Sequence, residues 1–191
     1  MTAKPQKVFI KLRKNQTVFP LEHLHEELIS LEVSAEGIKE LPESLSQLKK
    51  LELLSLNTPQ VEWLPKGIFQ LKNLKTIKIN ADIDELPKEM PSWSKLVNFQ
   101  LNNSSLNKIP EWFGQLNSLE YINFASNKIS EIPSVLKNLI HLKRLNLDNN
   151  QLRKFPFTPN DLTSLNHLSL DGNPFSDEEK ALIERTFGIW F

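Results

Sequence analysis

The chain repeats a pattern of apolar residues about every 23 positions, and this period restricts the possible folds more than any other feature. The first apolar residue of each repeat lies 23 residues from the next, except for one step of 22 residues: Leu28, Leu51, Leu74, Leu96, Leu119, Leu142 and Leu165. An apolar-Pro dipeptide recurs later in each repeat: Leu41-Pro42, Leu64-Pro65, Leu86-Pro87, Ile109-Pro110, Ile132-Pro133 and Phe155-Pro156. A fixed period of about 20–50 residues is typical of solenoids, in which each repeat is one structural unit stacked on the next.

Each repeat also contains two apolar residues separated by one other residue, which predicts a short strand because successive side chains of a strand point to opposite faces. We predict parallel strands over residues 31–33, 54–56, 77–79, 99–101, 122–124, 145–147 and 168–170. Asparagine occupies the same position, three residues after the strand, in three successive repeats: Asn127, Asn150 and Asn173. These side chains are expected to bond the backbone where the chain bends. One repeat alone cannot offset its conformational entropy, so stability requires stacking and capped ends.

The two ends of the chain carry different sequences that we interpret as caps. Residues 5–27 form a degenerate first repeat, in which Val8 to Leu12 is an added strand, Phe19-Pro20 resembles the later apolar-Pro step, and Leu21, Leu24 and Leu28 continue the pattern. Residues 176–191 are expected to form a C-terminal capping helix. The whole chain, residues 1–191, is then a single domain with its repeats at 28–175.

The C-terminal segment has the signals of a helix start and stop. Ser176 and Glu179 fit a capping box, and the acidic residues from Asp177 to Glu179 suit a helix N-terminus. Leu182, Ile183 and Phe187 form an apolar stripe that can cover the last repeat, and Gly188 stops the helix. The tail Ile189-Trp190-Phe191 is expected to tuck beneath it.

Composition excludes several classes of function. The 23 basic and 23 acidic residues give no net field to attract nucleic acid or a membrane surface, so neither is a predicted partner. The absence of cysteine excludes disulfides, thiol nucleophiles and thiolate zinc sites. No apolar stretch approaches the roughly 20 residues that span a bilayer, and residues 1–17 lack the apolar segment of an intact signal peptide.

These repeats resemble the leucine-rich repeat family, in the form L-x-x-L-x-x-L-x-L-x-x-N-x-L-x-x-L/I-P, over about residues 28–175. The 23-residue length and the ending Asn173-Pro-Phe-Ser-Asp-Glu-Glu-Lys180 are similar to bacterial members, particularly leptospiral ones. The resemblance implies an α/β solenoid, a curved right-handed superhelix with a parallel sheet on its concave face and turns or 3₁₀ segments on its convex face. It also implies protein binding through the concave face and favours a secreted or cell-surface location.

The outward residues of the predicted strands form columns, and one part of them combines residue types that are frequent at interfaces. Tyr121, Arg144 and His167 follow one another in one column, so they should lie side by side at about 4.7–4.9 Å per strand. Tyrosine and arginine are enriched at binding hot spots. We predict a partner-binding surface that consists of Tyr121, Asn123, Arg144, Asn146, Asp148, His167 and Asp171. The alternative is an ordinary solvated sheet face.

Three other features allow weaker hypotheses. An Asn-rich middle (Asn57, Asn80, Asn98, Asn102, Asn103 and Asn123) could recognise glycans or simply keep the sheet face polar. His23 and His25, flanked by acids, could contribute to a surface metal site, or they are solvated cap histidines. Trp63 and Trp112 fall outside the core positions of the repeat, on the loop and convex sides, where they either pack partly or form an exposed patch.

The sequence contains no Gly-rich phosphate loop and no G-x-S-x-G or H-E-x-x-H motif, and it indicates no cofactor. We therefore expect a non-enzymatic binding protein, an exported bacterial adhesin or effector that holds a protein on its concave face. The alternative is a structural protein that self-associates weakly into homo-oligomers, with or without a metal.

Overall fold

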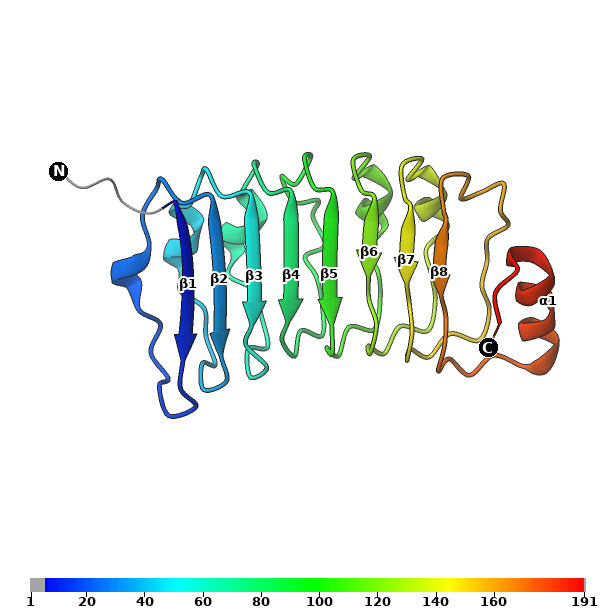
Figure 1. The fold of residues 1–191 in the computed structure, drawn as a ribbon, viewed down its shortest axis with the longest axis horizontal. Coiled ribbons are helices and arrows are strands. Elements are labelled where there is room, and N and C mark those ends of the chain that lie inside the picture. Colours follow the sequence, from blue (N-terminus) through cyan, green and yellow to red (C-terminus); the bar gives the residue numbers. More distant parts are fainter. Residues whose placement is uncertain (1–5, 191) are drawn as a thin grey trace.

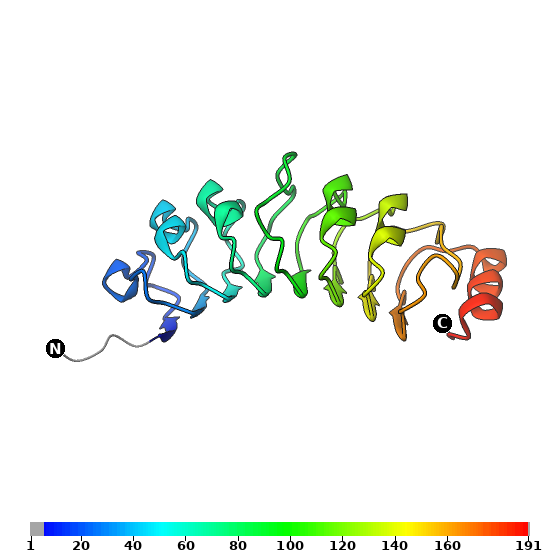
Figure 2. The same cartoon turned by 90° about the horizontal axis from the view of Figure 1, so that it is seen from above.

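The computed structural model describes residues 6–190 and contains one sheet of eight parallel strands that follow one another in chain order (Figure 1). The strands are β1 (Lys7–Leu12), β2 (Ser30–Ala35), β3 (Leu53–Asn57), β4 (Thr76–Asn80), β5 (Asn98–Asn102), β6 (Tyr121–Asn123), β7 (Arg144–Asn146) and β8 (His167–Ser169). The sheet curves, and short helices line its convex side while the helix α1 (Asp177–Phe187) closes the C-terminal end (Figure 2). The solenoid architecture and the parallel pairing predicted from the sequence are confirmed.

The register confirms that equivalent residues of successive repeats face each other across the sheet. Leu31 pairs with Leu54, and Leu54 pairs with Ile77, so the inward apolar residues form continuous columns. The last three strands end one residue earlier than predicted. In two of them an asparagine side chain takes the backbone N–H two residues further on: Asn123 Oδ1 accepts from Ala125 N and Asn146 Oδ1 accepts from Asp148 N, each at 2.9 Å. This local bonding competes with extension of the ladder.

The predicted asparagines form a buried ladder that joins one repeat to the next. Asn150 donates from Nδ2 to the carbonyls of Phe124 and Leu147 at 2.9 and 3.0 Å, and its Oδ1 accepts from the N–H of Ile129 at 3.0 Å. Asn127 and Asn173 make equivalent bonds in their own repeats. A side-chain amide therefore satisfies backbone groups that the bend would otherwise leave buried without partners.

Four of the six apolar-Pro dipeptides lead into 3₁₀ helices of the convex side, and Leu86-Pro87 and Phe155-Pro156 do not. These helices are η2 (Glu43–Gln47), η3 (Lys66–Gln70), η4 (Glu111–Gln115) and η5 (Ser134–Asn138), and a proline directly precedes each of them. Gly114 allows η4 to approach η5 closely, because a Cβ there would collide with the Val135 backbone. The 22-residue repeat has no such helix: its residues 84–92 form a loop that projects between η3 and η4 (Figure 2).

Six aromatic side chains pack together in and against the core beside this loop: Phe69, Trp93, Phe99, Trp112, Phe113 and Phe124. Trp93 is fully buried with its indole 5.5 Å from Phe69 and 6.0 Å from Phe99, ring centre to ring centre. Trp112 corrects the prediction that it lies outside the core, because it is buried, stacks on Phe113 at 4.5 Å and donates from Nε1 to a backbone carbonyl of the projecting loop at 2.8 Å. Trp112 thus packs against the short repeat, with its ring 6.1 Å from that of Trp93.

The N-terminal cap has the predicted added strand. β1 pairs in parallel with β2, and Ile10 and Phe19 are buried in the same core as the repeats. The short helix η1 (Leu21–His23) follows Pro20, as the later helices follow their prolines. Leu21, however, is exposed and does not continue the apolar pattern.

The C-terminal cap begins and ends as predicted, with corrections to three side chains. Ser176 Oγ accepts from the N–H of Glu179 at 3.2 Å, and Gly188 ends the helix with a φ of 67°. The capping box is incomplete, because the Glu179 carboxylate instead accepts from the N–H of Phe155 at 2.9 Å. Leu182 does not cover the last repeat and is exposed, and Trp190 is 85% exposed rather than tucked beneath the helix. Residues 1–5 and 191 lie outside the described residues, so the first residue of the predicted N-terminal cap and the Phe191 end of the tail are not described.

The first turn of α1 also holds a carboxylate in its charged form. Hydrogen bonds from its own backbone N–H and from the Ser176 hydroxyl keep the pKa of the Glu178 carboxyl below its usual value. A negative charge at this end of a helix is favourable because the unpaired N–H groups carry partial positive charge. No helix among residues 6–190 has the length and apolar character to cross a membrane.

Candidate protein-binding surface

The register of the last three strands brings three of the predicted binding residues into one row. Tyr121 is the direct pairing partner of Arg144, and Arg144 is the direct pairing partner of His167. All three side chains lie on the concave side, since the apolar neighbour in each strand, such as Ile122 or Leu145, points into the core. Arg144 and His167 are exposed and Tyr121 is half-buried. We call these three residues, with Asn123, Asn146, Asp148 and Asp171, the concave C-terminal surface.

Two asparagines lie beside this row on the same face of the sheet, and one of them bonds Tyr121. Asn123 and Asn146 are paired across β6 and β7 and are half-buried. Asn123 donates from Nδ2 to the Tyr121 hydroxyl at 3.3 Å while its Oδ1 holds the backbone after β6. The tyrosine ring is therefore held in place by a side chain that is itself fixed to the backbone. Such an arrangement reduces the entropy lost when a partner binds the ring.

Asp148 is engaged within the protein. Both of its carboxylate oxygens accept from the Ser169 hydroxyl, at 2.7 and 2.8 Å, and one of them also accepts from the Asp171 N–H at 2.8 Å. The side chain thus joins the ends of β7 and β8. The carboxylate of Asp171, in contrast, is exposed. Asp171 and Arg144 therefore supply the free charges of this surface, one of each sign.

The chemistry of the row suits recognition of a protein more than catalysis. Within residues 6–190, neither the Arg144 guanidinium nor the His167 imidazole has a hydrogen bond or an ion pair. An unpaired guanidinium can bind a carboxylate through two parallel hydrogen bonds or stack on an aromatic ring. An adjacent tyrosine adds a large apolar surface with one polar end. The residues lie on an open sheet face that does not exclude water, as most active sites do.

The N-terminal half of the concave face differs from this surface. Its asparagine amides bond to one another along the column after the strand: Asn80 donates to Asn57 at 2.8 Å, and Asn57 to Ser34 at 3.4 Å. These bonds favour the interpretation of a polar sheet face over a glycan site. Sequence reasoning missed Phe9, which lies on the outward side of β1 and is 64% exposed. The run Val8-Phe9-Ile10 was its signal, because one member of three adjacent apolar strand residues must point outward.

The two histidines of the N-terminal cap are not arranged as metal ligands. His23 is exposed at the end of η1, and its Nε2 lies 3.9 Å from the Glu22 carboxylate. Both ring nitrogens of His25 are inaccessible and have no hydrogen-bond partner. Within residues 6–190, no three His, Cys, Asp or Glu side chains gather in a way that could hold a metal ion. The structure therefore does not support the hypothesis of a metal site at His23 and His25.

Comparison with known proteins agrees with this geometry. The family model described as "Leucine rich repeat" matches residues 94–152, which include β5, β6 and β7. A structure of a Leptospira interrogans leucine-rich repeat protein has 27% sequence identity and a TM-score of 0.66 over 92% of this chain. The chain is a leucine-rich repeat solenoid. No curated protein matches it.

Two further structures share the leucine-rich repeat fold at lower identity. An internalin from Listeria monocytogenes superposes with a TM-score of 0.73 and 24% identity over 91% of the chain. A chain of the Toll–Spatzle complex from Drosophila does so with a TM-score of 0.69 and 21% identity over 89%. Our solenoid covers 51% of the internalin chain, 52% of the leptospiral chain and 24% of the chain from Drosophila. It therefore spans about half the length of the two bacterial structures.

Proposed function

We propose that this leucine-rich repeat solenoid is a protein-interaction module that holds its partner on the concave C-terminal surface. The observation that carries the proposal is the row Tyr121, Arg144 and His167, which projects from three adjacent strands with two of its polar groups unpaired. The remaining members of the surface are Asn123, which bonds the Tyr121 hydroxyl, Asn146, which bonds the backbone after β7, Asp148, which joins the strand ends, and Asp171, which adds a free carboxylate. A protein segment with a carboxylate opposite Arg144 and an apolar group opposite Tyr121 would complement it.

An exported bacterial adhesin or effector is the finer form of this proposal. It is supported by the likeness to the leptospiral protein over nearly the whole chain and by a fold shared with an internalin. An antibody against the chain tests it directly in the source organism. Detection at the cell surface or in the culture medium supports export, and detection only inside intact cells contradicts it.

The double substitution Tyr121→Ala/Arg144→Ala is expected to weaken binding of a protein partner by about 2 kcal/mol or more, roughly 30-fold in Kd. Both side chains lose most of their contact area in the double variant. The free energy of unfolding should change by less than about 0.5 kcal/mol, because neither side chain is in the core. The measurement is titration calorimetry with a partner purified on the immobilised wild-type chain.

Thr76→Ala is the matched control, because Thr76 lies in the same column on β4 but outside the concave C-terminal surface. It should bind as wild type does. Equal affinity of the double variant and the wild type for each purified partner would contradict the proposed surface.

A further inference from the structure

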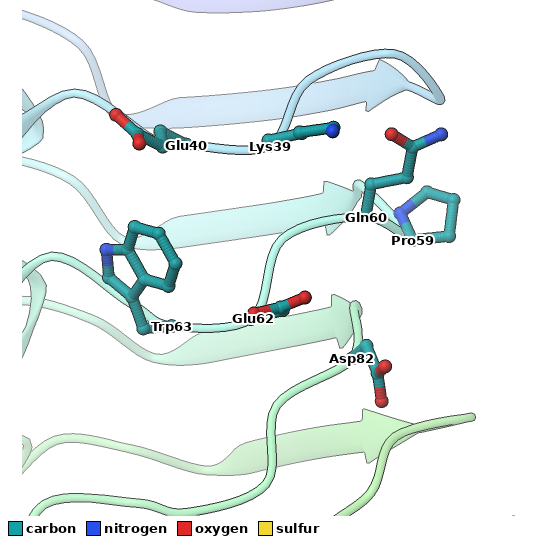
Figure 3. Close-up of a pocket in the computed structure, with 7 residues that line it drawn as sticks. All are labelled: Lys39, Glu40, Pro59, Gln60, Glu62, Trp63 and Asp82. Carbon is teal, nitrogen blue, oxygen red and sulfur yellow. The ribbon is translucent and has the colours of Figure 1, made fainter.

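The loops that follow the strands form a second surface with an ordered charge pattern. These loops begin at the carboxyl ends of the strands, the lower edge in Figure 1, and run back along the side of the solenoid toward the convex helices. In Figure 3, Lys39, Gln60 and Asp82 lie near the strand tips, and Glu40 and Trp63 lie further back. We call this side of the solenoid the post-strand flank; in each repeat it contributes the residue before the third apolar position and the two residues after it. All of its charged side chains are exposed. Its first three repeats carry five carboxylates: Glu40, Glu62, Asp82, Asp84 and Glu85.

The second half of the post-strand flank has the opposite charge. Its last three repeats carry four cations, Lys108, Lys128, Arg153 and Lys154. Each half contains one residue of the other sign, Lys39 in the acidic half and Glu131 in the basic half. The chain as a whole has no net charge, so this separation along one edge is a local property that total composition hides.

These flank charges have no ion-pair partners inside the solenoid, although Asp82 accepts a hydrogen bond from the Ser105 hydroxyl at 2.7 Å. On the opposite edge, which precedes the strands, charges pair from repeat to repeat: Lys75 with Glu52 at 2.9 Å and Lys143 with Glu120 at 2.8 Å. No ion pair among residues 6–190 includes a residue of the post-strand flank. The same stacking of repeats thus neutralises one edge internally and leaves the other edge with separated charges.

An exposed tryptophan lies within the acidic half. Trp63 is 52% exposed, and its indole extends across the flank toward the neighbouring Glu40 (Figure 3). It borders an open hollow of about 450 Å³ with Glu62 and Asp82. A second hollow of about 430 Å³ runs along the flank from Trp63 to Lys128, two repeats beyond Asp82. Trp63 is one of the two tryptophans that the sequence predicts to lie outside the core, and its exposure agrees with this prediction.

We propose that the post-strand flank binds the same flank of a second copy of this chain, in antiparallel orientation. A twofold axis between the third and fourth repeats places the two flanks against each other, so that the first repeat of one copy faces the sixth repeat of the other. The second residue after the third apolar position of each repeat forms one column, which contains Trp63. In this column, Glu40 then lies opposite Lys154 and Glu85 lies opposite Lys108. The symmetry repeats each pair, since a twofold interface is self-complementary.

The charge pattern favours a second copy over an unrelated basic protein. A basic partner would use only the acidic half and would be repelled by Lys108, Lys128, Arg153 and Lys154. A second copy uses both halves, covers both exposed Trp63 side chains and meets only one like-charge pair in this register, Lys39 with Arg153. Exposed ion pairs contribute little each, so the association is weak and salt-dependent.

Sedimentation velocity of the full chain tests the proposal with complementary charge reversals. Wild type should dimerise reversibly at concentrations up to about 0.5 mM in low salt and dissociate as salt rises. The variant Glu40→Lys/Glu85→Lys and the variant Lys108→Glu/Lys154→Glu should each raise the dimer Kd at least tenfold, because like charges then meet. An equimolar mixture of the two variants should form a heterodimer with a Kd close to that of the wild-type dimer. The chain that carries all four substitutions should form a homodimer with a similar Kd.

Two control variants distinguish this flank from the other surfaces. Glu26→Lys/Glu32→Lys makes the same charge change at two exposed residues, one before the strand β2 and one on its concave side, and should dimerise as wild type does. Tyr121→Ala/Arg144→Ala should also dimerise normally, so the result is independent of the concave C-terminal surface. A wild-type chain that stays monomeric in low salt overturns the proposal. So does a dimer that neither flank reversal weakens, or one whose loss the mixture does not restore.

Discussion

Deletion of residues 176–191 is expected to lower the melting temperature by roughly 6–12 °C and to cause aggregation, which corresponds to a loss of about 3 kcal/mol. The deleted segment covers the last repeat with buried Ile183 and with Phe187, whose ring meets that of Phe155 at 5.3 Å. The deletion also removes Glu179, whose carboxylate accepts the hydrogen bond from the Phe155 N–H. Terminal repeats need a polar outer face to remain soluble. Thermal denaturation followed by circular dichroism, with light scattering, measures both effects.

Two adjacent residues of α1 provide a matched test of the same cap. Ile183→Ser should destabilise the chain by about 3 kcal/mol because it places a polar group in the buried contact. Leu182→Ser should change stability by less than about 0.5 kcal/mol, since Leu182 is exposed. An unchanged melting curve for the truncated chain, or equal effects of the two serine substitutions, would show that α1 does not cap the solenoid.

Asn150→Ala is expected to destabilise the chain by about 3 kcal/mol, because it removes four hydrogen bonds of the buried ladder at once. The Ile129 N–H loses its acceptor, and three backbone carbonyls lose a donor. Urea denaturation at equilibrium measures the change in the free energy of unfolding.

Asn150→Asp keeps the size of the side chain but cannot donate from Nδ2, so it should be at least as destabilising as Asn150→Ala. Asn138→Ala is the control, because Asn138 is an exposed residue at the end of η5. If Asn150→Ala unfolds at the same urea concentration as Asn138→Ala, the ladder does not contribute to stability.

The strands and their register were predictable because one constraint acts in every repeat. An inward pair such as Leu54 and Leu56 must meet the equivalent pair of the next repeat, and a shift by one residue would turn both toward solvent. The row of Tyr121, Arg144 and His167 follows from the same register. Adjacent positions on a concave sheet could therefore be predicted from spacing alone.

The side chains that differ from prediction depend on contacts outside their own repeat. Trp112 is buried against the neighbouring repeat, which is one residue short, and no pattern within the Trp112 repeat reveals this contact. The Glu179 carboxylate binds the Phe155 backbone rather than its own helix start. Each choice depends on distances between repeats, whereas the sequence pattern describes positions within a repeat. The charge separation of the post-strand flank can be found in the sequence when equivalent residues of the repeats are aligned by the register of the strands.

Photo-crosslinking can show directly whether a protein partner binds on the concave C-terminal surface. A benzophenone amino acid replaces Tyr121 in one variant, Thr76 in a second and Glu111, on the convex helix η4, in a third, and each is irradiated with a purified partner. We expect a covalent complex from position 121 and none from position 111, with a weak product or none from position 76. A complex from position 111 with none from position 121 would contradict binding on the concave face.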